Sequence, residues 1–156
     1  MPDLVTHFAA AYILKVPRQW SKFRIPFYIG AILPDLLSRP FYIIYPSAAF
    51  VVYSFHTPLV TAVVCLLIAQ FFQEEIRPGV RRNLFLGIGL HYGLDLMQKY
   101  LISGYVWLFP FSWKSFSLQL FWSEEALQFV PVWVALVLGI ETFIQIKKRI
   151  RKENLP

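Results

Sequence analysis

Long apolar runs, separated by short clusters of basic residues, make up most of this chain. The runs predict helices over residues 3–15, 25–38, 58–75, 83–102 and 125–149. A helix that crosses a bilayer needs about 20 apolar residues, and the last three runs reach or nearly reach that length. The first two runs are shorter, so we expect those helices to be tilted, half-spanning or re-entrant.

The composition indicates that these helices lie in a membrane. Hydrophobic residues make up 57% of the chain and charged residues only 15%, whereas a soluble domain carries roughly 25% charged residues. We therefore predict an all-α, polytopic integral membrane helical bundle with about four to five membrane-embedded helices. The apolar stretch 41–55 contains Pro46 and is predicted to be an interfacial or broken helix. No linker or internal repeat divides the sequence, which predicts a single domain over residues 1–156.

The net charge of +6 does not indicate a nucleic-acid partner, because the basic residues lie in short clusters between apolar runs. The positive-inside rule places such clusters in the cytoplasm. We expect a multi-pass protein of the inner (plasma) membrane that contacts membrane lipids, with its C-terminus in the cytoplasm. The single cysteine, Cys65, excludes a disulfide framework within the chain and a cysteine-based zinc site, and we predict that it is a small core residue.

Every histidine and every aspartate of the chain lies in one of four short motifs. These residues are Asp3, His7, Asp35, His56, His91 and Asp95. Imidazole and carboxylate are ligands for Zn²⁺, Mn²⁺ and Fe²⁺, and ionisable residues inside a membrane are by default candidates for function. The predicted topology places all four motifs at a similar depth near the outer side. We therefore expect them to form one shared metal site.

Two of the motifs pair a histidine with an aspartate four residues away. His91 and Asp95 would share a helix face, so both could bind one metal, or Asp95 could orient the His91 ring. The alternative is an ordinary buried polar cluster in which Asp95 pairs with Lys99, four residues further on. In the other pair, His7 is a candidate ligand, whereas Asp3 is a candidate for either a ligand or a helix N-cap.

The other two motifs are weaker in isolation. Proline followed by Asp35 at the end of an apolar helix can mark only a turn. His56 precedes Thr57 and Pro58, which suit an N-cap and a first helical position, and His56 alone could be an interfacial histidine. The joint occurrence of the four motifs at one depth therefore indicates function more strongly than any one motif does.

Other features of the sequence are mostly structural. Trp107, Trp113 and Trp122 fit an aromatic belt at the membrane interface. The functional alternative is that they form an apolar substrate-contacting surface beside the site. Glu141 lies inside the last helix and nearer the predicted cytoplasmic side, so we exclude it from the site and expect it to snorkel or to pair with a nearby lysine.

The order and spacing of the motifs resemble a known family over roughly residues 1–115. The motifs are Met-Pro-Asp-Leu-Val-Thr-His ending at His7, Gly-Ala-Ile-Leu-Pro-Asp ending at Asp35, His-Thr-Pro-Leu beginning at His56, Gly-Leu-His-Tyr-Gly-Leu-Asp ending at Asp95, and Trp-Leu-Phe-Pro beginning at Trp107. This pattern resembles the membrane-bound metal-dependent hydrolases of bacteria and archaea. The resemblance implies metal-dependent hydrolysis but names no substrate.

Together these observations predict a membrane-embedded metal-dependent hydrolase with its site near the outer leaflet. Asp35 and Asp95 are the candidate catalytic carboxylates, and Zn²⁺ is the first expectation, with Mn²⁺ or Fe²⁺ suited to a mixed nitrogen and oxygen site. A site reached from the membrane suggests a lipid substrate, and a phosphoester lipid most of all. The alternatives are a non-enzymatic membrane protein with a structural metal site or an ion- or proton-conducting polar cluster, and an assembly factor with a degenerate site.

Overall fold

The computed structural model describes residues 4–14, 23–48, 54–99 and 106–153, and these are predominantly helical. The helices are α1 Leu4–Leu14, α2 Arg24–Ile44, the 3-10 turn η2 Pro46–Ala48, α4 Pro58–Gln70, α5 Arg77–Leu96, α6 Ser123–Gln128 and α7 Val130–Glu153. Two short strands, β1 Gln98–Lys99 and β2 Phe121–Trp122, pair in parallel. The predicted all-α class is therefore confirmed for the described part of the chain.

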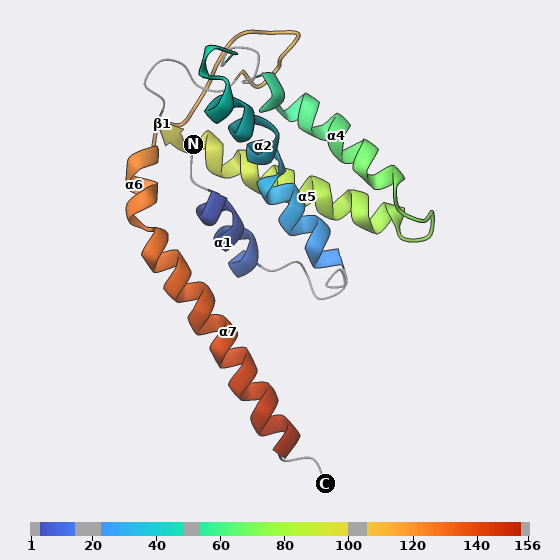
Figure 1. Ribbon diagram of the computed structural model, residues 1–156, viewed down its shortest axis with the longest axis vertical. Coiled ribbons are helices and arrows are strands. Elements are labelled where there is room, and N and C mark those ends of the chain that lie inside the picture. The colour runs from blue at the N-terminus through green and yellow to red at the C-terminus, as the bar shows by residue number, and fades with distance from the viewer. Residues whose placement is uncertain (1–3, 15–22, 49–53, 100–105, 154–156) are drawn as a thin grey trace.

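Helices α1, α2, α4 and α5 pack around one another, while α7 projects beyond them as a long rod (Figure 1). Buried side chains from α2, α4 and α5 form the main core: Leu33, Cys65, Val80, Leu84, Ile88 and Tyr92. Cys65 is fully buried in this core, as predicted. The core therefore fixes α5, which carries two of the candidate ligands, against its neighbours.

Glycines allow α2 and α5 to cross at very short range. A Cβ atom on Gly30 would lie 2.2 Å from the carbonyl oxygen of Leu84, and one on Gly87 would lie 2.2 Å from that of Phe27. Small residues at a helix crossing let the two backbones approach closely. Gly87 lies one helical turn before His91, and Gly30 lies five residues before Asp35, so the crossing brings these two side chains to the same place.

Several predicted element bounds are wrong. The second helix does not end at residue 38 but continues through Pro34 and Pro40 to Ile44. A proline removes one backbone hydrogen bond and bends a helix, and the packing of α2 against α5 compensates for this loss. The first part of the predicted broken segment 41–55 is therefore the end of α2, followed by η2, and residues 49–53 lie outside the described residues.

The third and fourth helices are also shorter or shifted relative to the prediction. Helix α4 ends at Gln70 rather than residue 75, and α5 spans Arg77–Leu96 rather than residues 83–102. A short turn joins the two helices, and Arg77 bonds back to the carbonyl oxygen of Phe72 there, with its Nε and Nη2 atoms at 3.2 and 3.1 Å. This contact satisfies a carbonyl just beyond the end of α4 and fixes the start of α5.

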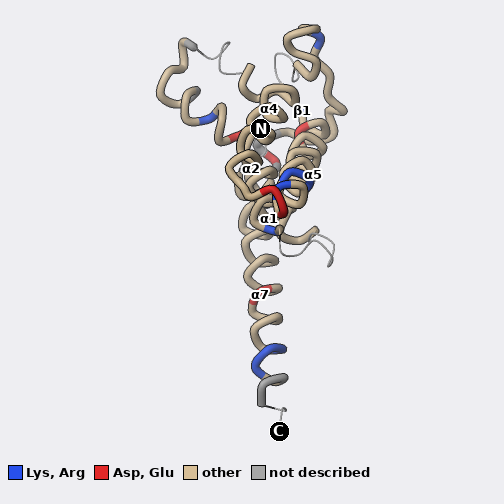
Figure 2. The backbone as a smooth tube through the Cα atoms, turned by 90° about the vertical axis from the view of Figure 1, so that its right-hand side faces the viewer, with Lys and Arg blue, Asp and Glu red and all other residues tan. Residues whose placement is uncertain are grey.

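Within the described residues, one helix is long and apolar enough to cross a bilayer. This is the stretch Val130–Ile150 of α7, whose mean hydropathy is 1.6 and which contains no buried residue in its most apolar window. Basic residues lie toward its C-terminal end (Figure 2). Helices α1 and α4 are apolar but shorter, so the multi-pass topology stays a prediction.

Candidate metal centre

Four separate segments bring all the described candidate ligands into one buried cluster. His7 comes from α1, Asp35 from α2, His56 from the turn before α4, and His91 and Asp95 from α5. Each of these five side chains is fully buried. The sixth candidate, Asp3, lies outside the described residues. We call these five residues the His–Asp cluster.

Asp95 lies at the centre of the His–Asp cluster and is close to all three histidines. Its Oδ2 atom lies 2.8 Å from Nε2 of His56 and 3.2 Å from Nε2 of His91. Its Oδ1 atom lies 3.5 Å from Nε2 of His7. One carboxylate therefore receives three imidazole nitrogens from three different segments.

The hydrogen bonds of His91 define which of its nitrogens can bind a cation. Its Nδ1 atom lies 2.7 Å from the carbonyl oxygen of Ala31, and because a carbonyl only accepts hydrogen bonds, Nδ1 must carry the proton. In the neutral ring, Nε2 then presents a lone pair to Oδ2 of Asp95. Two acceptors that face each other need a proton or a metal cation between them.

The His56 ring lies between Ser38 and Asp95. Its Nδ1 atom lies 3.1 Å from Ser38 Oγ, and the single proton of that hydroxyl can be donated to the carbonyl oxygen of Pro34 at 3.0 Å. When the neutral His56 ring carries its proton on Nδ1, its Nε2 atom presents a lone pair to Asp95 Oδ2 at 2.8 Å, and when it carries the proton on Nε2, it donates to that oxygen. In the first tautomer, two histidine lone pairs and one carboxylate oxygen converge on a common point.

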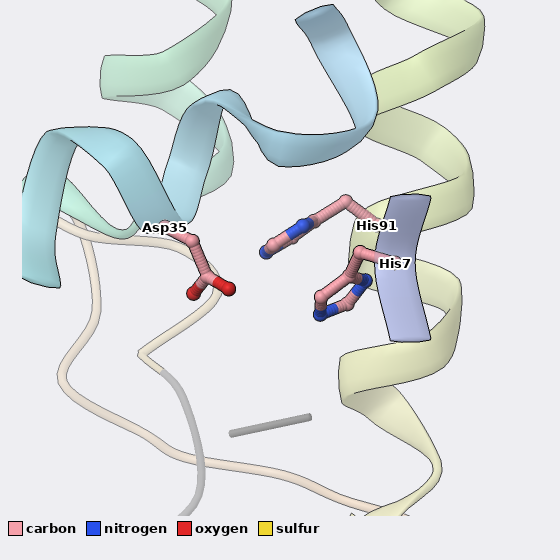
Figure 3. A group of neighbouring side chains, drawn as sticks. All are labelled: His7, Asp35 and His91. Atoms are coloured by element: carbon pink, nitrogen blue, oxygen red, sulfur yellow. The ribbon is translucent and has the colours of Figure 1, made fainter. Parts of the chain in front are cut away.

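His7 and Asp35 complete the cluster from the other side. The His7 ring stacks on the His91 ring, with centroids 3.9 Å apart and planes inclined by 20°. The Asp35 carboxylate points toward both rings (Figure 3). Within the described residues, neither ring nitrogen of His7 and neither carboxylate oxygen of Asp35 makes a hydrogen bond. Asp35 Oδ2 is paired instead with the Arg39 guanidinium group at 3.1 Å, and His7 Nε2 lies 3.5 Å from Asp95 Oδ1. Buried polar atoms without a hydrogen bond are costly, and a bound cation would satisfy His7 Nδ1 and Asp35 Oδ1 or their neighbours in the cluster.

Two overlapping sets of donor atoms have the spacing that a metal ion needs. They are His7, Asp35 and His91 in one set, and His56, His91 and Asp95 in the other, with the donor atoms of each set within 4.8 Å of one another. Nitrogen and oxygen donors of this kind suit Zn²⁺, Mn²⁺ or Fe²⁺. Both sets use His91, whose Nδ1 is already bonded to Ala31, so its Nε2 can serve only one ion at a time. The geometry therefore fits one metal ion better than two.

Sequence reasoning did not assign a role at the site to Ser38 and Arg39. Ser38 holds the His56 ring. The Arg39 Nη2 atom lies 3.1 Å from Asp35 Oδ2, and the Arg39 side chain is 26% exposed. Their spacing of three and four residues after Asp35 places all three on one face of a helix. This signal was hidden because Asp35 was expected at the end of its helix rather than within it.

The structure also decides between several structural alternatives. Pro34 and Asp35 lie inside α2, so they do not mark a turn. His56 is fully buried and is therefore not an interfacial histidine. Thr57 and Pro58 do hold the predicted N-cap and first helical positions of α4, but the Thr57 hydroxyl donates to the carbonyl oxygen of Ser54 at 2.9 Å rather than capping the helix.

Lys99 does not form the predicted alternative pair with Asp95. Its ammonium group lies 5.4 Å from the centre of the Trp122 ring, a cation–π distance, while Asp95 is occupied by the histidines. The first tryptophan of the predicted belt, Trp107, packs against the core and forms an edge contact with Tyr92, whose ring in turn contacts His91. Trp107 therefore lies behind the His–Asp cluster, whereas Trp113 and Trp122 are exposed.

Glu141 lies outside the His–Asp cluster, as predicted, but it is held in an unexpected way. Its Oε2 atom accepts a hydrogen bond from the Tyr12 hydroxyl of α1. This bond joins the long helix α7 to the short helix that carries His7. A carboxylate within an apolar helix is costly unless it is partnered, and Tyr12 supplies a partner.

The described residues form a helical protein with a buried histidine–carboxylate centre and one helix long and apolar enough to cross a membrane. The chain matches the family model of the YdjM inner membrane protein over residues 4–154, and it therefore belongs to this family. No curated protein and no solved structure matches the chain. Family membership confirms the expected inner-membrane class and agrees with the membrane part of the resemblance, while a metal and hydrolysis stay proposals.

Proposed function

We propose that the chain is a membrane-embedded metal-dependent hydrolase that binds its metal in the His–Asp cluster. The observation that carries this proposal is the convergence of the Nε2 atoms of His56 and His91 on Asp95 Oδ2, at 2.8 and 3.2 Å. With both rings protonated on Nδ1, this fully buried arrangement holds three acceptors and is unfavourable without a cation. The chemistry of the donors favours Zn²⁺, with Mn²⁺ or Fe²⁺ as alternatives.

The protein's part in this chemistry is to hold and orient the donors. The Ala31 carbonyl fixes the His91 ring and Ser38 fixes the His56 ring, which are typical supports for metal-binding histidines. When bound, the metal would lower the pKa of a coordinated water and polarise the scissile bond. The Asp95 carboxylate lies within 3.5 Å of all three histidines, whereas the Asp35 carboxylate lies 3.8 Å from His56 Nδ1, so Asp35 is the better placed of the two carboxylates to accept a proton from that water.

The surroundings of Asp35 support a phosphoester lipid as the substrate. Arg39 pairs with Asp35 and is the partly exposed cation at the edge of the cluster. A guanidinium group matches phosphate oxygens well. On the same half of α2, Leu36 and Ile43 are 45% and 74% exposed, and such apolar side chains suit acyl chains. This arrangement combines a buried hydrolytic centre with an edge that suits an anionic lipid.

A second function is favoured by one specific observation, the complete burial of all five cluster side chains. A catalytic metal site keeps a position open for water or substrate, whereas a structural site is closed. The alternative is therefore a non-enzymatic membrane protein in which the cluster holds a structural metal, or shares protons among His56, His91 and Asp95. Turnover separates the enzyme from a structural metal protein, and metal content separates both from a proton-sharing cluster.

The first experiment is elemental analysis of the full chain purified in detergent, after incubation with Zn²⁺ or Mn²⁺ and desalting. The proposal expects near-stoichiometric metal in the wild type and little in His91→Ala. The matched control is Asn83→Ala, which removes another fully buried polar side chain from α5 at a distance from the cluster and should keep its metal. A screen of phosphoester lipids with the metal-loaded protein follows, and metal binding without turnover of any lipid would favour the structural site.

A further inference from the structure

A groove between α4 and α5 lies apart from the His–Asp cluster and has a distinct chemistry. Its volume is about 500 Å³, and it is lined by Leu66 of α4 and by Pro78, Arg81, Arg82, Phe85 and Leu86 of α5. Its lining residues lie toward the ends of α4 and α5 that the short turn joins, and Figure 1 shows these two helices side by side near that turn. None of its lining residues is acidic, so the groove carries a net positive charge.

The lining residues of α5 form a single exposed helix face with a change of polarity along it. Pro78, the adjacent pair Arg81 and Arg82, and the adjacent pair Phe85 and Leu86 follow one another at intervals of three to four residues, which places them on one face. All five are exposed. The two arginines occupy the N-terminal part of this face, and the two large apolar side chains follow one turn later. The face therefore has a basic part followed by an apolar part. The basic part is complementary to an anionic lipid head group, and the apolar part is complementary to an acyl chain.

The third arginine of this region has a different task. Arg77 donates to the carbonyl oxygen of Phe72 and lies 3.9 Å from Glu74 Oε1, so it belongs to the turn between α4 and α5. Arg81 and Arg82 line the groove.

We propose that the α4–α5 groove binds an anionic phospholipid of the surrounding membrane, with its phosphate on Arg81 and Arg82 and an acyl chain along Leu66, Phe85 and Leu86. The chain belongs to an inner membrane protein family, so such lipids surround it. Basic pockets between membrane helices bind anionic head groups, and arginine pairs with phosphate through two hydrogen bonds. This inference is independent of the metal and of any catalytic activity.

The test measures lipid binding to the full chain in a neutral detergent. Phosphatidylglycerol is the anionic lipid probe and phosphatidylcholine is the zwitterionic one. Inorganic phosphate is the third probe, because it presents the phosphate group without acyl chains. We expect selective binding of phosphatidylglycerol by the wild type. The double variant Arg81→Gln/Arg82→Gln should raise its Kd by about tenfold or more, as expected for the loss of charge-assisted hydrogen bonds. The matched control Lys147→Gln/Lys148→Gln removes the same charge from α7 and should leave the Kd within about twofold.

A second variant keeps both arginines and changes only the apolar wall. Leu86→Asn, at a position that is 41% exposed, should weaken phosphatidylglycerol binding without changing the weak binding of inorganic phosphate. Equal losses in the two double variants would overturn the proposal in favour of general charge attraction. Equal affinity for inorganic phosphate and phosphatidylglycerol would overturn it in favour of a free-anion site, and equal affinity for both lipids would exclude recognition of the anionic head group.

Discussion

Nε2 of His91 lies 3.2 Å from Oδ2 of Asp95 on the next turn of α5, while the other nitrogen of the same ring is bonded to the carbonyl oxygen of Ala31 on α2. The position of the proton on the His91 ring therefore depends on the crossing of α2 and α5. Because the Ala31 carbonyl holds the Nδ1 proton, the neutral ring must present a lone pair to the carboxylate. A proton or a metal ion between His91 Nε2 and Asp95 Oδ2 would satisfy both atoms.

Replacing Asp95 with asparagine should separate cation binding from folding. The amide nitrogen of Asn can donate to the lone pairs of His56 and His91, which removes the clash of acceptors. We expect the metal-free variant to unfold at the same temperature as the metal-free wild type or higher, although its metal content should fall by at least about tenfold. Thermal unfolding and elemental analysis of the same preparation test both parts. A variant that still binds metal fully would remove Asp95 from the ligand set.

Ser38→Ala should weaken metal binding without removing a ligand. The variant loses the hydroxyl that orients His56, and loss of such a support typically costs about 10–100-fold in metal affinity. The matched control is Thr142→Ala in α7, whose hydroxyl also bonds a carbonyl four residues earlier, that of Leu138 at 2.8 Å, but touches no histidine of the cluster. Competition with a zinc-binding dye gives both affinities. Equal affinities in Ser38→Ala and the wild type would argue against an orienting role.

Two glycines of α5 provide a matched test of the helix crossing. A Cβ atom on Gly87 would collide with the α2 backbone, whereas one on Gly89 would meet nothing within 4 Å. We expect Gly87→Ala to destabilise the fold by about 1–3 kcal/mol through overpacking. Gly89→Ala should be neutral or stabilising by up to about 1 kcal/mol, because alanine favours a helix. Unfolding in detergent measures both changes, and similar effects at the two positions would contradict the crossing described for α2 and α5.

Metal removal should lower the stability of the wild type but not that of His91→Ala. A ligand that binds only the folded chain stabilises it by about 2.7 kcal/mol at one hundred times its Kd. We therefore expect a chelator to lower the unfolding temperature of the zinc-loaded wild type and to leave that of His91→Ala unchanged. A chelator effect of the same size in both proteins would place the metal elsewhere.

The pairing of His91 with Asp95 could be predicted from sequence because it depends on helix periodicity alone. The approach of His7 to His91 and of His56 to Asp95 depends on how separate helices pack, which sequence spacing does not encode. The predicted common depth of the motifs anticipated that they would meet, but it did not specify their contacts.

The roles of Ser38 and Arg39 were missed for a different reason. The predicted helix ends at residue 38, with Asp35 near its end, whereas α2 continues through Pro40 to Ile44 because its packing against α5 outweighs the lost hydrogen bond. Once the helix is known to continue, the spacing from Asp35 places both residues beside it. The packing of α2 against α5 therefore decides where α2 ends, and local helix propensity alone predicted this position wrongly.

The measurement that tests the central claim most directly is X-ray absorption at the zinc edge of the zinc-reconstituted full chain. The account predicts imidazole nitrogen and carboxylate oxygen ligands at about 2.0–2.2 Å, in a site of about four ligands, and loss of the imidazole signal in His91→Ala. A spectrum of zinc bound only to water or detergent oxygens, or a spectrum that His91→Ala does not change, would contradict a metal centre in the His–Asp cluster.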